Sequence, residues 1–83
     1  MNDEKTFKYT LANLSIGDFC VVRGFKDVDR SLRKKLLSMG VTPKITIEVV
    51  RVAPLGDPIE IKVRGFSLTL RKNEAEHIII SKI

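Results

Sequence analysis

The residues from 59 to 70 carry the pattern that most constrains how this chain can fold. Apolar side chains occupy the odd positions of residues 59–63 and the even positions of residues 66–70. Such alternation is typical of a β-strand with one buried face, and its phase changes across Arg64 and Gly65. A two-residue turn there places both apolar sets on one side of a hairpin, because glycine adopts the positive φ that such turns need. The pattern therefore predicts that Val63 lies opposite Phe66, since a slip of one residue would expose one set to water.

A third strand is predicted before this hairpin. Apolar residues alternate over residues 45–49, and then the phase shifts because Val50 and Val52 are both apolar. A bulge near Val49 and Val50 accounts for that shift. Residues 53–58 are predicted to form a turn, because their two prolines cannot donate hydrogen bonds to a ladder. The three strands together are expected to form an antiparallel meander.

One helix is predicted between the first strand and the meander. The residues that recur at the period of a helix and form one apolar stripe are Val28, Leu32, Leu36 and Met39. Either Asp27 or Asp29 can cap the first turn of this helix. Gly40 is placed to end it as the C′ residue, with Val41 closing back on the last turn.

Two more strands complete the expected sheet. The first comprises residues 19–25, and its run from Phe19 to Val22 does not alternate, which is expected of a strand that is covered on both faces or that coils through a small barrel. The last comprises residues 77–81, because isoleucine strongly favours strands. A single helical turn, capped by Asn73 and extending across residues 74–76, is expected just before it.

These elements predict a mainly β fold, a small five-stranded barrel. Their order resembles an SH3-like barrel with one helix between the first and second strands and a single helical turn before the last. With 83 residues the chain is expected to be one domain, residues 9–83. The polar residues 1–8 are expected to form a flexible N-terminal tail.

The net charge of the chain limits the kinds of partner that the protein is expected to bind, but it does not select one of them. The chain has 15 basic and 10 acidic residues and a net charge of +5. That charge suits an acidic protein surface, anionic lipid headgroups or nucleic acid. The first ten residues are charged where a signal peptide would be apolar, and no apolar run approaches the roughly 18 residues that a membrane span needs. A cytoplasmic protein is therefore expected.

No residue pattern indicates catalysis, a cofactor or a metal site. The one cysteine, Cys20, lies in an apolar run and is expected to act as a small buried hydrophobe. The one histidine, His77, has no second histidine or cysteine nearby, and Asp27 and Asp29 form at most an incomplete pair of metal ligands. No glycine-rich phosphate loop and no paired nucleophile and base are present. The sequence therefore predicts that the protein is not an enzyme.

Two leucines stand where polar residues are expected. Leu37 lies away from the stripe of the helix, so either the helix buries a wide arc or Leu37 contacts a partner among the neighbouring cations. Leu55 lies in the turn of residues 53–58, so either it folds back over the end of the barrel or it contacts a partner. The residues predicted as candidate partner contacts are Leu55, Leu37, Arg33, Lys34, Arg30 and Arg51.

Four stretches of the sequence also resemble a known family. They are LSIGD at residues 14–18, RKKLLSMGVTP at residues 33–43, VVRVAPLGDPIEI at residues 49–61 and LTLRKNEA at residues 68–75. Together they look like the bacterial ferrous iron transport protein A family, FeoA, and the resemblance extends over nearly the whole chain, from Leu11 to Ile80. The stretch VVRVAPLGDP is specific. Lys44 departs from the family, which usually has glycine after the proline that follows the helix.

The resemblance implies an accessory or adaptor protein of ferrous iron uptake. Its implied partner is the cytosolic G-protein region of a membrane Fe(II) permease of the FeoB type, and membrane association would then run through this partner. No cofactor is implied. An arginine that acts in trans on a partner's GTP hydrolysis is conceivable, with Arg33, Arg51 or Arg64 as candidates.

Two alternatives stay open at this point. A small basic barrel can bind nucleic acid, although Phe19, Phe25 and Phe66 lie in strand patterns that predict burial rather than base stacking. A strand edge near residues 50–52 can pair with a second copy of the chain, which leaves a homo-oligomer open.

Overall fold

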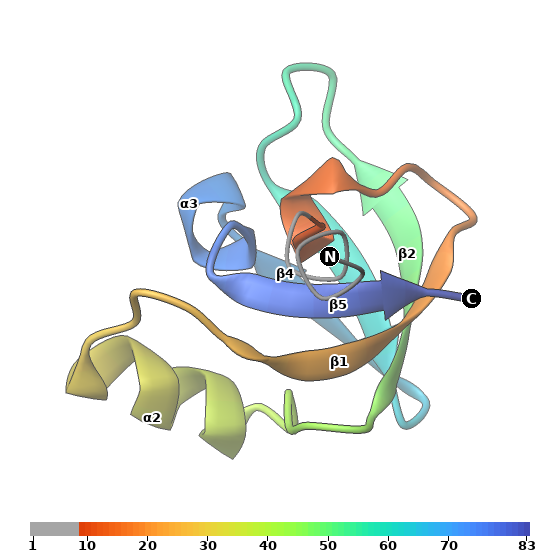
Figure 1. Cartoon of the computed structure of the whole chain (residues 1–83). Coiled ribbons are helices and arrows are strands. Elements are labelled where there is room, and N and C mark those ends of the chain that lie inside the picture. The colour runs from red at the N-terminus through yellow and green to blue at the C-terminus, as the bar shows by residue number, and fades with distance from the viewer. Residues whose placement is uncertain (1–8) are drawn as a thin grey trace, which may run out of the picture.

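The computed structural model describes residues 9–83, and the tail expected at residues 1–8 lies outside this range. In chain order the elements are η1 (Leu11–Asn13), β1 (Phe19–Phe25), α2 (Arg30–Ser38), β2 (Thr46–Val52), β3 (Ile59–Val63), β4 (Phe66–Leu70), α3 (Lys72–Ala75) and β5 (Ile78–Lys82). The strands form one antiparallel sheet in the order β4-β3-β2-β1-β5, which curls around the core with α2 outside it (Figure 1). The fold is mainly β, with helical segments before β2 and before β5 as predicted, although α2 starts at Arg30, two residues after the first residue of the predicted stripe, Val28.

Alternate residues of the strands fill the inside of the curled sheet. The fully buried strand residues are Cys20, Val22, Ile47, Val49, Ile61, Leu70, Ile78 and Ile80. The helical elements add Leu11, Leu36 and Ala75, which are also fully buried. Within residues 9–83, no buried side-chain nitrogen or oxygen lacks a hydrogen-bond partner. The core is therefore a single apolar cluster to which every element contributes.

The hairpin of β3 and β4 has the predicted register. Ile59 pairs with Leu70, and Val63 pairs with Phe66. Both turn residues have positive φ, 53° at Arg64 and 84° at Gly65. Two successive positive φ angles define a type I′ turn, whose twist matches that of the strands it joins.

The predicted bulge in β2 is also present. The pairing of β2 with β3 shifts between Val49 and Arg51, so the apolar side chains change phase there. The ladder between β1 and β2 ends at Glu48, and beyond it Arg51 and Val52 pair with β3, whereas Val50 is the bulged residue. At the opposite end of the sheet, a bridge between Thr10 and Ile79 covers part of the outer edge of β5.

Of the two explanations for the apolar run of β1, coverage on both faces is wrong. Cys20 and Val22 are buried, whereas Phe19 is 46% exposed. The alternative, a strand that coils through a small barrel, remains.

The burial predicted for Phe19 and Phe66 was wrong. Phe66 is 72% exposed, although its place in the alternation predicted burial. Its partner across the ladder, Val63, is buried, so distance from the turn is not the reason. β4 is instead an edge strand of the sheet, and Leu70 is its one buried residue. Of the three strand phenylalanines, Phe25 packs against the core.

Helix α2 begins and ends at the predicted signals. The Asp29 carboxylate accepts a hydrogen bond from the backbone N–H of Leu32, so Asp29 rather than Asp27 is the cap. At the other end Gly40 has a φ of 92°, and the N–H of Val41 donates to the carbonyl of Leu36 at 3.0 Å. This is a Schellman motif. None of the helices in residues 9–83 is long and apolar enough to cross a bilayer.

The short helix before the last strand starts earlier than predicted. The cap residue is Arg71, and Asn73 lies inside α3. The Glu74 carboxylate reaches back to accept a hydrogen bond from the backbone N–H of Arg71 at 2.9 Å. This hydrogen bond to the third residue of α3 satisfies a backbone N–H at the start of the helix, and Asn73 was the residue expected to cap that start. The last strand, Ile78–Lys82, is one residue later than predicted, and His77 precedes it.

The backbone at Lys44 yields a test of stability. Its φ is 76°, and its N–H donates to the carbonyl of Val22 at 2.7 Å, so the left-handed conformation is held in place. That conformation costs a non-glycine residue about 1 to 2 kcal/mol, of which the extra freedom of an unfolded glycine cancels a part. Lys44→Gly should therefore raise the free energy of unfolding by about 0.5 to 1 kcal/mol in a urea titration. Lys44→Ala is the control, because it removes the charge and keeps the Cβ; an equal gain in Lys44→Ala would contradict the backbone explanation.

Candidate functional site

The described residues contain no arrangement typical of a metal site or of catalysis. No group of three or more His, Cys, Asp and Glu residues within 9–83 could hold a metal ion. Burial, and then the charge of Asp18, raise the pKa of the Cys20 thiol to about 11, so it stays protonated at neutral pH. Nδ1 of His77 lies 2.9 Å from the carbonyl oxygen of Lys26, which ties the imidazole to the chain. The candidate site is therefore a surface.

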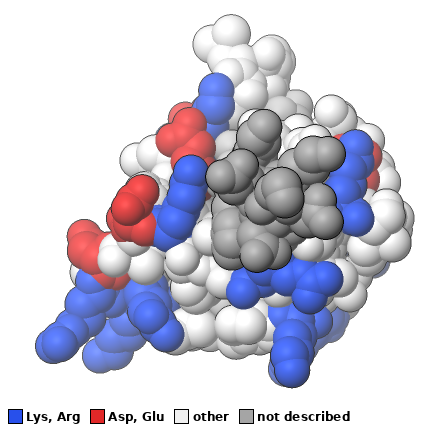
Figure 2. Space-filling model, in the orientation of Figure 1, with Lys and Arg blue, Asp and Glu red and all other residues white. Residues whose placement is uncertain are grey.

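The outer side of α2 forms the first candidate surface, the helix surface, made of Arg30, Arg33, Lys34 and Leu37. Its three cations are exposed, and Leu37 is 37% exposed. Leu36, the residue before Leu37, is fully buried against the barrel. Helix α2 therefore buries only one narrow side, and Leu37 lies outside that side, among the cations. Figure 2 shows the Lys and Arg side chains gathered over this helix.

The loop between β2 and β3 forms the second candidate surface, the loop tip, centred on Leu55. Leu55 is 91% exposed, so the alternative that it folds back over the barrel is wrong. The loop is braced at its base, because the N–H of Ala53 donates to the carbonyl of Pro58 and the N–H of Gly56 to that of Ala53. An apolar side chain on a braced loop loses little conformational freedom when it is buried by a partner.

The six predicted contact residues thus divide between two separate places. Four of them make up the helix surface, and Figure 1 shows α2 and the β2–β3 loop at opposite ends of the molecule. Arg51 lies on β2 near the base of the loop, and its Nε is 3.5 Å from Oε1 of Glu60. A single compact partner surface cannot cover all six residues at once.

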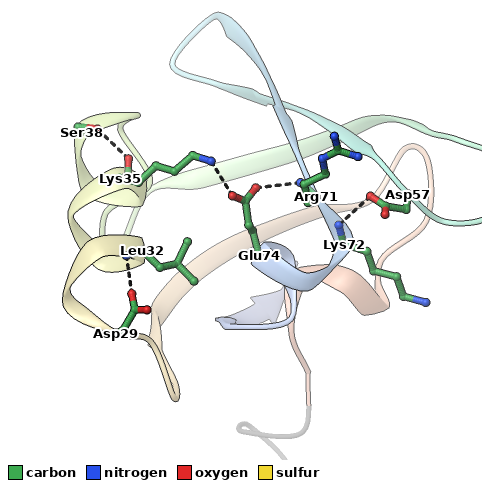
Figure 3. A network of polar contacts seen from close by, with 8 residues as sticks. All are labelled: Asp29, Leu32, Lys35, Ser38, Asp57, Arg71, Lys72 and Glu74. Carbon is green, nitrogen blue, oxygen red and sulfur yellow. Dashed lines mark hydrogen bonds and ion pairs between the residues drawn. The ribbon is translucent and has the colours of Figure 1, made fainter.

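The helix α3 connects these two places through polar contacts (Figure 3). The Lys35 ammonium lies 2.6 Å from Oε2 of Glu74, which joins α2 to α3. The Asp57 carboxylate accepts from the backbone N–H of Lys72 at 3.0 Å, which joins the loop to α3. Two open polar hollows flank α3, one beside Asp57 and the other beside His77.

Sequence reasoning missed two residues of these surfaces. Phe66 was expected in the core, but β4 is an edge strand of the sheet, which alternation alone does not show. Asp57 contacts a backbone group 15 residues further along the chain. No local pattern predicts such a contact, because it depends on where α3 packs. By contrast, the spacing of Arg71 and Glu74 is that of a helix start and could have shown the cap.

Comparison with known proteins gives this fold a family context. The model of the FeoA domain family matches residues 9–82. A curated Fe(2+) transport protein A/Fe(2+) transporter FeoB fusion protein of Porphyromonas gingivalis is 37% identical over 51 residues, 61% of this chain and 6% of that protein. This chain therefore spans only a small part of the length of that relative.

Solved structures share the whole fold. The solution structure of a FeoA protein from Chlorobium tepidum is 36% identical, with 90% of this chain and 70% of that chain covered and a TM-score of 0.82. Stenotrophomonas maltophilia FeoA with zinc, described as a procaryotic SH3 domain protein, is 22% identical, with 88% and 89% covered and a TM-score of 0.77. At that identity the likeness concerns the fold alone, and it confirms the predicted SH3-like architecture.

The bond between Lys35 and Glu74 yields a prediction of pH dependence. The hydrogen bond from Lys35, and then that from the Arg71 N–H, hold the pKa of Glu74 below its ordinary value. A lowered folded-state pKa adds stability above the pKa of an unfolded glutamate, about 4.3, and that stability is lost as the pH falls through the folded value. Glu74→Gln should lower the free energy of unfolding by about 0.5 to 1 kcal/mol at neutral pH, and this difference should disappear as the pH falls through the lowered folded-state pKa of Glu74.

The matched control removes the other partner. In a Lys35→Met background, Glu74→Gln should change the free energy of unfolding by much less, because the ion pair is already absent. Denaturant titrations of the four proteins at several pH values measure both effects. A cost of Glu74→Gln that stays constant down to acid pH would show that packing rather than charge accounts for it.

Proposed function

The chain belongs to the FeoA domain family, and from this premise we propose that it is a non-enzymatic accessory protein of ferrous iron uptake. Its partner under this proposal is the cytosolic G-protein region of a membrane Fe(II) permease. The observation that carries the proposal is the Porphyromonas gingivalis relative, whose name joins a transport protein A and a FeoB transporter in one chain. Two proteins that are fused in one organism commonly act together when they are separate, and the small size of this chain leaves room for little beyond a contact surface.

The loop tip is the proposed docking element on this chain. Leu55 exposes 91% of its surface, whereas Leu37 exposes 37%, so Leu55 has the larger apolar area available for burial against a partner. The loop is also linked to the body by the bond from the Lys72 N–H to Asp57, so the tip is presented in a fixed place. The side chains that contribute most to binding lie in well-packed, desolvated pockets of an interface, and the proposal places Leu55 in such a pocket of the partner.

A binding assay with the purified cytosolic domain of the permease tests this docking element. Leu55→Ala should weaken binding about tenfold or more, because full burial of a leucine contributes about 1.5 to 3 kcal/mol. Ile16→Ala is the matched control, since Ile16 is an exposed aliphatic residue, 62% exposed, in a different turn. Leu37→Asp tests the helix surface in the same assay.

The outcomes of this assay distinguish a wrong docking element from a wrong partner. Binding by the parent chain that neither Leu55→Ala nor Leu37→Asp weakens, with both variants folded, would remove both residues from the interface and leave the partner in place. A parent chain that does not bind the cytosolic domain in any nucleotide state would contradict the partner. The corresponding cellular measurement is Fe(II) uptake in cells that lack this protein and keep the permease; unchanged uptake would overturn the proposed function itself.

A further inference from the structure

One end of the barrel brings together elements that are far apart in the sequence. The outer side of α2, the connection from α2 to β2 and the β3–β4 turn form the lower boundary of the molecule in Figure 1. The pairing of Ile47 with Val63 places the start of β2 beside the β3–β4 turn. At the end of α2, a Cβ at Gly40 would lie 3.9 Å from Cγ1 of Val63. A single flat surface can therefore touch all three elements.

This end of the barrel is basic. Its exposed cations are Arg33, Lys34, Lys44 and Arg64, and we call these four residues the basic end. Within residues 9–83 the ion pairs are those of Lys35, Arg51 and Lys82, so none of the four has an acidic partner there. Figure 2 shows Lys and Arg side chains along the lower boundary, whereas the acidic side chains visible in this view lie higher.

Apolar side chains are interspersed with these cations. Phe66 is 72% exposed and lies two residues from Arg64. Leu37 is 37% exposed and follows Arg33 and Lys34 by four and three residues, which places all three on one side of α2. Cations that surround a few exposed apolar residues on one plane are typical of proteins that lie on an anionic membrane surface.

We propose that the basic end binds the surface of an anionic phospholipid bilayer, with its four cations on the lipid phosphates and Phe66 inserted among the headgroups. Each Lys or Arg near such a surface contributes about 1 kcal/mol, so four cations and one aromatic ring give weak, reversible binding. The proposal goes beyond the proposed function, in which membrane contact runs through a protein partner alone. It leaves the loop tip, at the other end of the molecule, free to meet that partner.

A lipid surface fits this end of the barrel better than nucleic acid does. Single-stranded nucleic acid is bound by several aromatic side chains in a row, on which successive bases stack. The other exposed aromatic residues of the described chain, Tyr9 and Phe19, lie on other parts of the sheet. Phe19 begins β1, which two strands separate from β4, and the Tyr9 carbonyl accepts from Ile80 on β5. Phe66 is thus isolated at this end, which suits insertion of one ring and not a stacking platform.

Co-sedimentation of the full chain with vesicles tests the proposal without any permease. The protein should bind vesicles of phosphatidylglycerol and phosphatidylcholine in equal parts, bind pure phosphatidylcholine vesicles poorly, and be released by high salt. Lys34→Glu/Arg64→Glu should weaken binding about thirtyfold or more, because two contacts of about 1 kcal/mol each are lost and become repulsive. Phe66→Ser should weaken it about tenfold without a change of charge.

A matched pair of substitutions controls for net charge. Lys26→Glu/Lys72→Glu makes the same change of charge at two exposed cations that line the hollows beside α3. This control should retain most of the binding. Equal weakening by both pairs would overturn the proposal, because it would show that net charge alone attracts the protein. The proposal is also wrong if Phe66→Ser binds as the parent does, if the parent does not bind phosphatidylglycerol vesicles, or if a single-stranded oligonucleotide binds more tightly and displaces the vesicles.

Discussion

The burial of alternate side chains inside one small curled sheet is the constraint on which the rest of this structure depends. A chain of 83 residues buries a smaller fraction of its surface than a larger domain does, so each strand has to place its apolar face toward the same centre. The hairpin of β3 and β4 shows how strictly this holds, because Ile59, Ile61 and Val63 are all nearly or fully buried. A shift of that hairpin by one residue would remove a large share of the core at once.

The same constraint determines which side chains are left for the surface. Nearly all of the buried apolar side chains come from the strands and from one face of the helical elements. This protein differs from other small barrels in the side chains that lie outside the core. Leu55 and Phe66 are the clearest of these, because each exposes most of its surface at opposite ends of the molecule. The chain belongs to the FeoA domain family, and one relative joins a transport protein A to a FeoB transporter in a single chain.

The sequence predicted those features that depend on neighbours along the chain. The β3–β4 register followed from the change of parity at Gly65, and the end of α2 followed from Gly40 and Val41. Features that depend on depth within the fold were not predicted. Alternation tells which face of a strand a residue occupies, and not whether that strand lies at the edge of the sheet, so the burial predicted for Phe66 on β4 was wrong. The exposure of Leu55 and the contact of Asp57 with α3 depend on packing between distant segments, which no local pattern records.

The contacts of α3 have a structural consequence. The Asp57 carboxylate fastens the β2–β3 loop to the start of α3, and the Glu74 carboxylate fastens α3 to Lys35 on α2. These two contacts form a continuous polar connection from the β2–β3 loop to α2, with α3 as its only intermediate element. A substitution that removes either carboxylate would therefore separate the loop from the helix in this connection.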